Sequence, residues 1–118
     1  MRKVDRIFIV KYKVELFQTP REDYPVEDFI EEQELALQTK IAHHIRLLTE
    51  YGPYLKPPFT KKLANKLYEL RISGKVAVRI FYTQLNNTYY LIHAFKKKTQ
   101  KTPRKEIVIA LDRIKHLV

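Results

Sequence analysis

Four cationic side chains, Arg71, Arg79, Lys96 and Lys98, interrupt a stretch whose other residues have the pattern of β-strands. The stretch covers residues 67–103 and reads LYELRISGKVAVRIFYTQLNNTYYLIHAFKKKTQKTP. Arg79 lies inside the apolar run VAVRIFY, where the desolvation of a guanidinium is costly unless an anion meets it. Guanidinium and ammonium groups that converge beside aromatic rings suit a phosphodiester backbone and an unstacked base. The pattern therefore favours a sheet face that binds phosphate.

The turn residues predict which side chains share that face. Asn86–Asn87 is typical of a two-residue hairpin turn, which places Leu85 opposite Thr88 and Arg79 opposite Ala94. Side chains alternate along a strand, so the face of Arg79 would also carry Ala77, Phe81, Tyr90, Ile92, Ala94, Lys96 and Lys98. The core face would carry Val78, Ile80, Tyr82, Tyr89, Leu91, His93 and Phe95.

Two alternatives stay open at this point. Arg71 joins the face of Arg79 only if the preceding hairpin, between Ile72 and Val76, has an odd number of loop residues; a two-residue loop turns Arg71 toward the core. In the other alternative, Arg79 pairs with Glu69, the lysines lie on a solvated strand end, and nothing is bound.

The helices and strands that position these cations are predicted to form an α+β fold. A strand is predicted over residues 4–16, and a helical region runs from Asp23 or Pro25 to Gly52–Pro53, as one helix or as two broken near Glu34. Residues 53–66 are expected to be an irregular basic segment, with a possible helical turn at 61–65. Strands are predicted over 67–73, 76–85 and 88–97. A last helix begins at Thr102–Pro103.

Composition limits the classes of protein that remain. The 118 residues suit one domain spanning 1–118, and the absence of cysteine excludes disulfides and thiolate metal sites. No stretch reaches the roughly 18 apolar residues of a membrane helix, so a soluble, cytosolic protein is expected. The formal net charge of +10 attracts phosphate backbones or an acidic protein partner.

The four histidines are weak candidates for chemistry. His43 and His44 are adjacent and do not face together on a helix, so no metal site is expected. His93 is interpreted as a core or hydrogen-bonded residue. His116 is interpreted as an exposed residue at a helix end, where the helix dipole favours its charge.

Several segments together resemble a known family. LYELR, the strand VRIFY, the strand and turn YYLIHAFKKKTQKTP and the helix KEIVIALDRIK resemble the RelE/HigB-like toxins of bacterial type II toxin–antitoxin modules, especially the phage-derived branch. LTEYGPYLKPPFTKKL fits as well, and the resemblance covers roughly residues 25–116. The segment between Leu16 and Pro25 is longer than is usual there. The resemblance implies a small, mostly antiparallel sheet with an N-terminal helix or helix pair on one face, and a C-terminal helix.

The resemblance also implies a function. A toxin of this kind enters the ribosomal A site and cuts mRNA without metal or cofactor, the 2′-hydroxyl attacking the adjacent phosphate while cations stabilise the charge of the transition state. The implied catalytic residues are Arg71, Arg79, Lys96, Lys98 and His116. The implied RNA-binding residues are Lys61, Lys62, Lys97, Lys101 and Tyr90.

The implied partners are the ribosome, mRNA and a cognate antitoxin, expected to be a helix-turn-helix protein with an acidic contact segment. No membrane is expected to be involved. Two other functions remain open: a gyrase-inhibiting toxin of the ParE type, which shares the fold, and a basic nucleic-acid-binding module without catalysis. The chain itself shows no helix-turn-helix pattern, which counts against a DNA-reading repressor.

Overall fold

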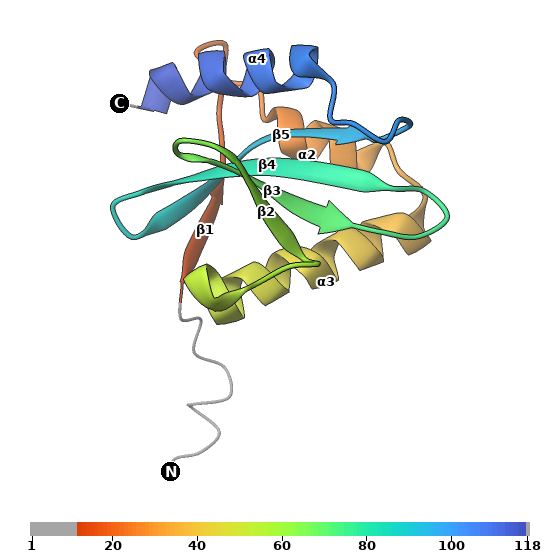
Figure 1. Ribbon diagram of the computed structural model, residues 1–118. Helices are drawn as coiled ribbons and strands as arrows, with labels where there is room; N and C mark the ends of the chain where they lie inside the picture. Colours follow the sequence, from red (N-terminus) through yellow and green to blue (C-terminus); the bar gives the residue numbers. More distant parts are fainter. Residues whose placement is uncertain (1–11, 118) are drawn as a thin grey trace.

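The computed structural model describes residues 12–117 and contains a five-stranded sheet in the order β1-β5-β4-β3-β2 (Figure 1). β1 pairs with β5 in parallel, and the other neighbours are antiparallel. The strands are β1 (Lys13–Leu16), β2 (Thr60–Ala64), β3 (Leu67–Ile72), β4 (Val78–Leu85) and β5 (Thr88–Lys96). The predicted strand at 4–16 is thus observed over its last four residues, and residues 4–11 lie outside the described part.

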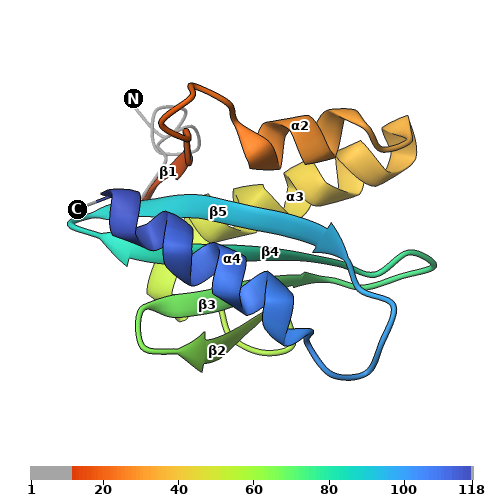
Figure 2. The same ribbon diagram turned by 90° about the horizontal axis from the view of Figure 1, so that it is seen from above.

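The helices cover both faces of the sheet. α2 (Pro25–Glu31) and α3 (Leu35–Tyr51) form the predicted pair, separated at Glu34, and α3 lies under one face. α4 (Arg104–Ile114) crosses the opposite face (Figure 2). Short 3₁₀ turns follow α3 (Gly52–Tyr54) and α4 (Lys115–Leu117). The α+β class and the mostly antiparallel sheet are therefore confirmed. None of the helices in residues 12–117 is long and apolar enough to cross a membrane.

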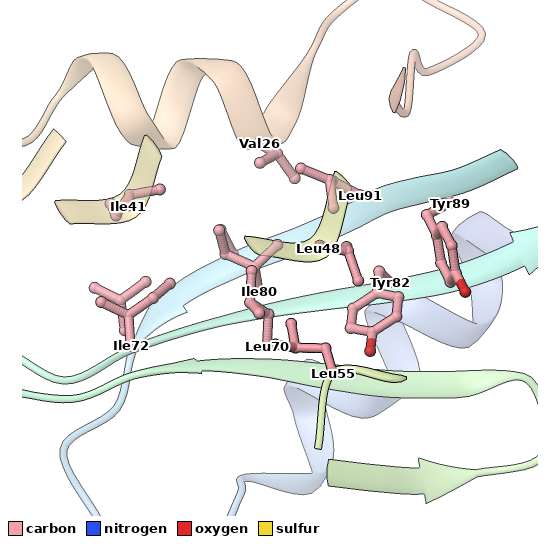
Figure 3. Packing of buried hydrophobic residues seen from close by; sticks show 12 residues of the cluster. Val26, Ile41, Leu48, Leu55, Leu70, Ile72, Ile80, Tyr82, Tyr89 and Leu91 are labelled. Atoms are coloured by element: carbon pink, nitrogen blue, oxygen red, sulfur yellow. The ribbon is translucent and has the colours of Figure 1, made fainter. Parts of the chain in front are cut away.

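Two apolar clusters hold these layers together. The larger lies between α3 and the sheet, and Figure 3 shows residues from α2, α3 and the strands β3, β4 and β5 converging there, among them Val26, Ile41, Leu48, Ile80 and Leu91. The smaller lies under α4 and contains Phe17, Leu67, Phe81, Ile92, Phe95 and Ala110. Because both faces are buried, the central strands read as nearly continuous apolar runs instead of a strict alternation.

The hairpin of β4 and β5 corrects the predicted register. Leu85 opposes Thr88 as expected, with Asn86 at φ 57°, but the pairing shifts by one residue between Phe81 and Tyr82. Arg79 consequently opposes Phe95 and not Ala94. A β-bulge of this kind adds one residue to one strand, so every side chain beyond it moves to the other face. Ala94 and Lys96 therefore face α3, whereas His93 and Phe95 face α4.

The prediction for residues 53–66 was wrong at its end. Residues 60–64 form the strand β2, and residues 61–65 form no helical turn. The segment pairs with β3, with Lys61 opposite Glu69 and Lys62 opposite Tyr68. The three prolines of the segment precede β2, so no ladder donor is lost within the strand. Its consecutive lysines are typical of an edge strand that avoids pairing with another chain.

His93 ties β5 to α4. Its Nε2 lies 2.6 Å from Oε1 of Glu106, and Nη1 of Arg113 lies 3.1 Å from its Nδ1. Arginine can only donate, so Nδ1 is the acceptor and Nε2–H donates to Glu106. The interpretation of His93 as a hydrogen-bonded residue is confirmed. Burial lowers its pKa, the bond to Glu106 opposes this shift, and the charge of Arg113 adds to it.

We expect this cluster to make stability depend on pH. Because the folded-state pKa of His93 is lowered, the unfolded chain binds the extra proton first, and stability falls as the pH drops below about 6.5. His93→Gln offers the same acceptor and donor without titrating, so its free energy of unfolding should fall less over this range. Urea unfolding of both proteins from pH 7.5 to pH 5.5 measures the difference. Equal losses in the two proteins would contradict the assignment.

Candidate nucleic-acid interface

A cationic hollow lies on the α4 face of the sheet, where β3 ends and β4 begins. It has a volume of about 360 Å³, and its charged lining is Arg71, Arg79, Lys97 and Lys98. Arg71 opposes Arg79, and Ile72 opposes Val78, which leaves residues 73–77 as the loop. Five loop residues are an odd number, so the condition that places Arg71 on the face of Arg79 is met.

A buried carboxylate lies beneath these cations. Glu69 is 1% exposed, and its Oε1 is 2.9 Å from Nε of Arg79 and 3.9 Å from Nε of Arg71. The Arg79 contact is a close ion pair without the alignment of a hydrogen bond. Thr102 reaches the other carboxylate oxygen at 3.5 Å. Arg79 therefore does pair with Glu69, as the second interpretation of the sequence expected.

Arg79 is held rigidly inside the hollow. Arg79 is 6% exposed, and its Nη1 donates a hydrogen bond to the carbonyl of Val78 at 3.1 Å. Burial lowers its pKa, and the charge of Glu69 opposes that shift. Arginine is the most basic side chain and is effectively always protonated in proteins, so Arg79 keeps its charge. The site thus contains a permanent, oriented guanidinium at its base.

Lys97 completes the cluster. Its backbone N–H donates to the carbonyl of Ala77 at 2.9 Å, which extends the β4–β5 pairing beyond the end of β5. Partial burial lowers the pKa of its ammonium group, and the charges of Arg79, Arg71 and Lys61 lower it further against the single opposing charge of Glu69. Cations in this arrangement repel one another, so an anion bound among them would relieve the repulsion.

Lys61, on the edge strand, lies beside the hollow without lining it, and its charge acts on Lys97. It opposes Glu69 across β2 and β3, which puts it on the same face as the hollow. Lys62, one residue later, lies on the α3 face, with its Nζ 6.0 Å from the ring centroid of Tyr68. The backbone thus directs the two lysines to opposite faces of the sheet, but at the sheet edge Lys61 also borders the α3 side.

A comparison with known protein families assigns the chain to one of them. The family model described as "Phage derived protein Gp49-like (DUF891)" matches residues 28–115, most of the chain. The chain belongs to the Gp49-like family. This family is part of the RelE/ParE toxin superfamily. The match runs from α2 to α4 and includes every residue of the cationic hollow. None of the curated proteins searched matched the chain.

Three residues predicted from the sequence lie apart from the hollow of this Gp49-like chain. Lys96 is exposed on the α3 face, beside Lys40 and the turn between α2 and α3. His116 is exposed just after α4, with Nδ1 3.2 Å from the carbonyl of Asp112. Tyr90 packs with the same end of α4, because Leu117 lines its surroundings. α4 starts near the hollow and runs toward the opposite end of β5 (Figure 2).

Lys101 lies in the exposed connection that leads from β5 to α4. From the sequence, Glu69 was considered as a partner of Arg79 only for the case in which nothing is bound, and not as part of a phosphate site, although one signal for that was present. Glu69 and Arg71 are two residues apart in LYELR, and this spacing puts both on one face of a strand. Within residues 12–117, no three carboxylate or imidazole side chains gather as ligands of one metal ion would.

Proposed function

We propose that this Gp49-like chain is the toxin of a toxin–antitoxin module and cuts mRNA on the ribosome as an endoribonuclease. The observation that carries the proposal is the cationic hollow, in which Arg71, Arg79 and Lys97 surround one buried carboxylate and open to solvent. Such an arrangement suits the phosphate of a single RNA strand, because fixed cations stabilise the extra charge that develops in phosphodiester cleavage. Membership of the RelE/ParE superfamily supports the same class of activity.

The proposed reaction needs only groups of the RNA and of the hollow. The 2′-hydroxyl oxygen bonds to the adjacent phosphorus, its proton passes to water, and the bond from phosphorus to the 5′-oxygen breaks. The products are a 2′,3′-cyclic phosphate and a 5′-hydroxyl. Arg71 and Arg79 hold the non-bridging phosphate oxygens. Lys97 lines the same hollow as both arginines, and its ammonium group donates the proton that the leaving 5′-oxygen takes up.

The proposed protein partner is an antitoxin whose contacting segment presents carboxylates to the same hollow. Opposite charges accelerate association, and salt screens them. We therefore expect the purified antitoxin to associate more slowly at moderate salt than at low salt. An association rate that does not change with salt would contradict an acidic contact segment.

The class of toxin is tested by induction in a bacterium. We expect protein synthesis, followed by pulse labelling, to stop before DNA synthesis, with cleaved mRNA that ends in cyclic phosphates. A strain that expresses Arg79→Lys should continue to grow, and serves as the control for the burden of expression. Early loss of DNA synthesis with intact translation would instead identify a gyrase poison and overturn the proposal.

A further inference from the structure

A second pocket, the tyrosine pocket, lies on the α3 face behind the edge strand β2. It has a volume of about 250 Å³, and Tyr68, Tyr82 and Tyr89 form its aromatic wall. The Tyr68 and Tyr82 rings are stacked, with centroids 5.5 Å apart and planes at 20°, and Tyr89 meets Tyr82 edge-on at 5.8 Å. The volume lies below the roughly 300–1,000 Å³ of sites for drug-sized ligands, so the pocket suits a single planar ring.

The rim of the tyrosine pocket is cationic. Lys56, Lys61 and Lys62 line it, and among the described residues no Asp or Glu does. Tyr82 and Tyr89 have raised pKa values, chiefly because of burial, so their hydroxyls stay neutral at physiological pH and do not repel an anion. The combination of an aromatic wall with an ammonium rim matches a nucleotide, which has a flat base and a negative phosphate.

One side chain in the pocket can read a base edge. Gln84 lines it and is exposed, so its amide offers a donor and an acceptor to a ring placed against Tyr68. Unstacked bases in RNA are recognised in this way, by stacking on an aromatic ring and by hydrogen bonds to their edges. Tyr68 is only half-buried, whereas Tyr82 and Tyr89 are each 4% exposed. Tyr68 is therefore the ring that a base can reach.

The two sites meet at the β2 edge. Lys61 lines the tyrosine pocket and also lies close enough to Lys97 to lower its pKa, so it belongs to both sites. Lys62 follows it on the other face. Consecutive strand residues are about 3.3 Å apart, so a strand of RNA that crosses β2 would meet one ammonium group on each side of the edge.

We propose that the tyrosine pocket is a subsite for one base of single-stranded RNA, a few nucleotides away from the phosphate in the cationic hollow. The base stacks on Tyr68, Gln84 contacts its edge, and Lys61 and Lys62 hold the phosphates that cross β2. The choice of RNA as the source of the nucleotide rests on the proposed function. A free mononucleotide shares the chemistry of the pocket and is distinguished by experiment.

The test uses the free protein and a 2′-O-methyl hexaadenylate, which has no attacking 2′-hydroxyl and is not cut by the proposed reaction. One adenine at a time is replaced by 2-aminopurine, whose fluorescence is quenched by stacking. We expect strong quenching at one position. Tyr68→Leu should remove that quenching and weaken binding about tenfold, within the range found for single base–aromatic stacks.

Two lysine variants distinguish binding at the tyrosine pocket from nonspecific attraction of RNA by the positive charge of the protein. Lys62→Ala should weaken binding and lower the slope of log K against log salt by about one, whereas Lys105→Ala, an exposed residue of α4 that lines neither site, should change binding little. Circular dichroism of each variant checks the fold. If Tyr68→Leu leaves the wild-type fold intact and still binds and quenches as wild type, the subsite is wrong.

Two further outcomes are decisive. AMP that binds as tightly as the hexamer, and with the same loss in Tyr68→Leu, would show a mononucleotide site and overturn the RNA assignment. Failure of the proposed function gives a different result. If the protein binds the hexamer through Tyr68 but does not cut mRNA, the base subsite is supported and the nuclease function is overturned. If the protein cuts mRNA and Tyr68→Leu changes neither binding nor cleavage, only the base subsite is overturned.

Discussion

Arg79→Lys is expected to lower the rate of mRNA cleavage on the order of 10²-fold, the loss seen when one preorganised donor to a developing oxyanion is removed. The substitution keeps the positive charge but removes the planar guanidinium that binds two oxygens at once. In the structure the Nε side of Arg79 faces Glu69 and Nη1 is bound to Val78, so the orientation of the group is set before a phosphate arrives. The effect should therefore appear in the chemical step.

The measurement is single-turnover cleavage of mRNA bound to ribosomes, together with ribosome affinity. Affinity should change little, because the flexible lysines around the hollow remain. Arg46→Lys, on the exposed side of α3, makes the same chemical change far from the hollow and should cleave at the wild-type rate. Cleavage by a folded Arg79→Lys protein at nearly the wild-type rate would exclude Arg79 as the phosphate-holding group.

Glu69→Leu is expected to destabilise the protein by about 3–5 kcal/mol, because it leaves a buried guanidinium without its counter-charge. Glu69 is 1% exposed, and Arg71, Arg79 and Lys97 would all lose the one carboxylate that opposes them. Urea unfolding gives the free energy from the midpoint and the slope. Glu50→Leu, an exposed glutamate of α3, should change stability by no more than about 0.5 kcal/mol.

A double variant shows whether the loss comes from the pair. Replacing both partners, as Glu69→Leu with Arg79→Leu, removes the unpaired charge and should recover much of the lost stability, since buried ion pairs replaced by apolar residues are often no less stable. If the double variant is as unstable as the sum of the two single variants, the pair does not account for the burial of Arg79.

Local patterns in the sequence were enough to determine the kinds and the order of most elements, but not the strand β2 at residues 60–64. The helical region after Pro25, left open as one helix or two, the strands at 67–73, 76–85 and 88–97 and the last helix were predicted from periodicity and turn residues. The turn at Asn86–Asn87 was predicted together with the adjacent pairing of Leu85 with Thr88, because turn geometry depends on the residues of the turn, whereas the register beyond Tyr82 was wrong. Placing Arg71 beside Arg79 needed only the parity of one loop, which the sequence left open and the structure shows to be odd.

Which side chains meet in the hollow was decided by tertiary structure. The bulge beside Tyr82 turns Lys96 away and brings in Lys97, because one extra residue in a strand exchanges the two faces for everything beyond it. Pairing of β2 with β3, across a turn at residues 65–66 that was not predicted from the sequence, brings Lys61 opposite Glu69. α4 begins at the connection from β5 that lines the hollow and runs away from it (Figure 2), so His116, in the 3₁₀ turn that follows α4, lies apart from the hollow. Periodicity reports the faces of one element, and only packing decides which faces of different elements come together.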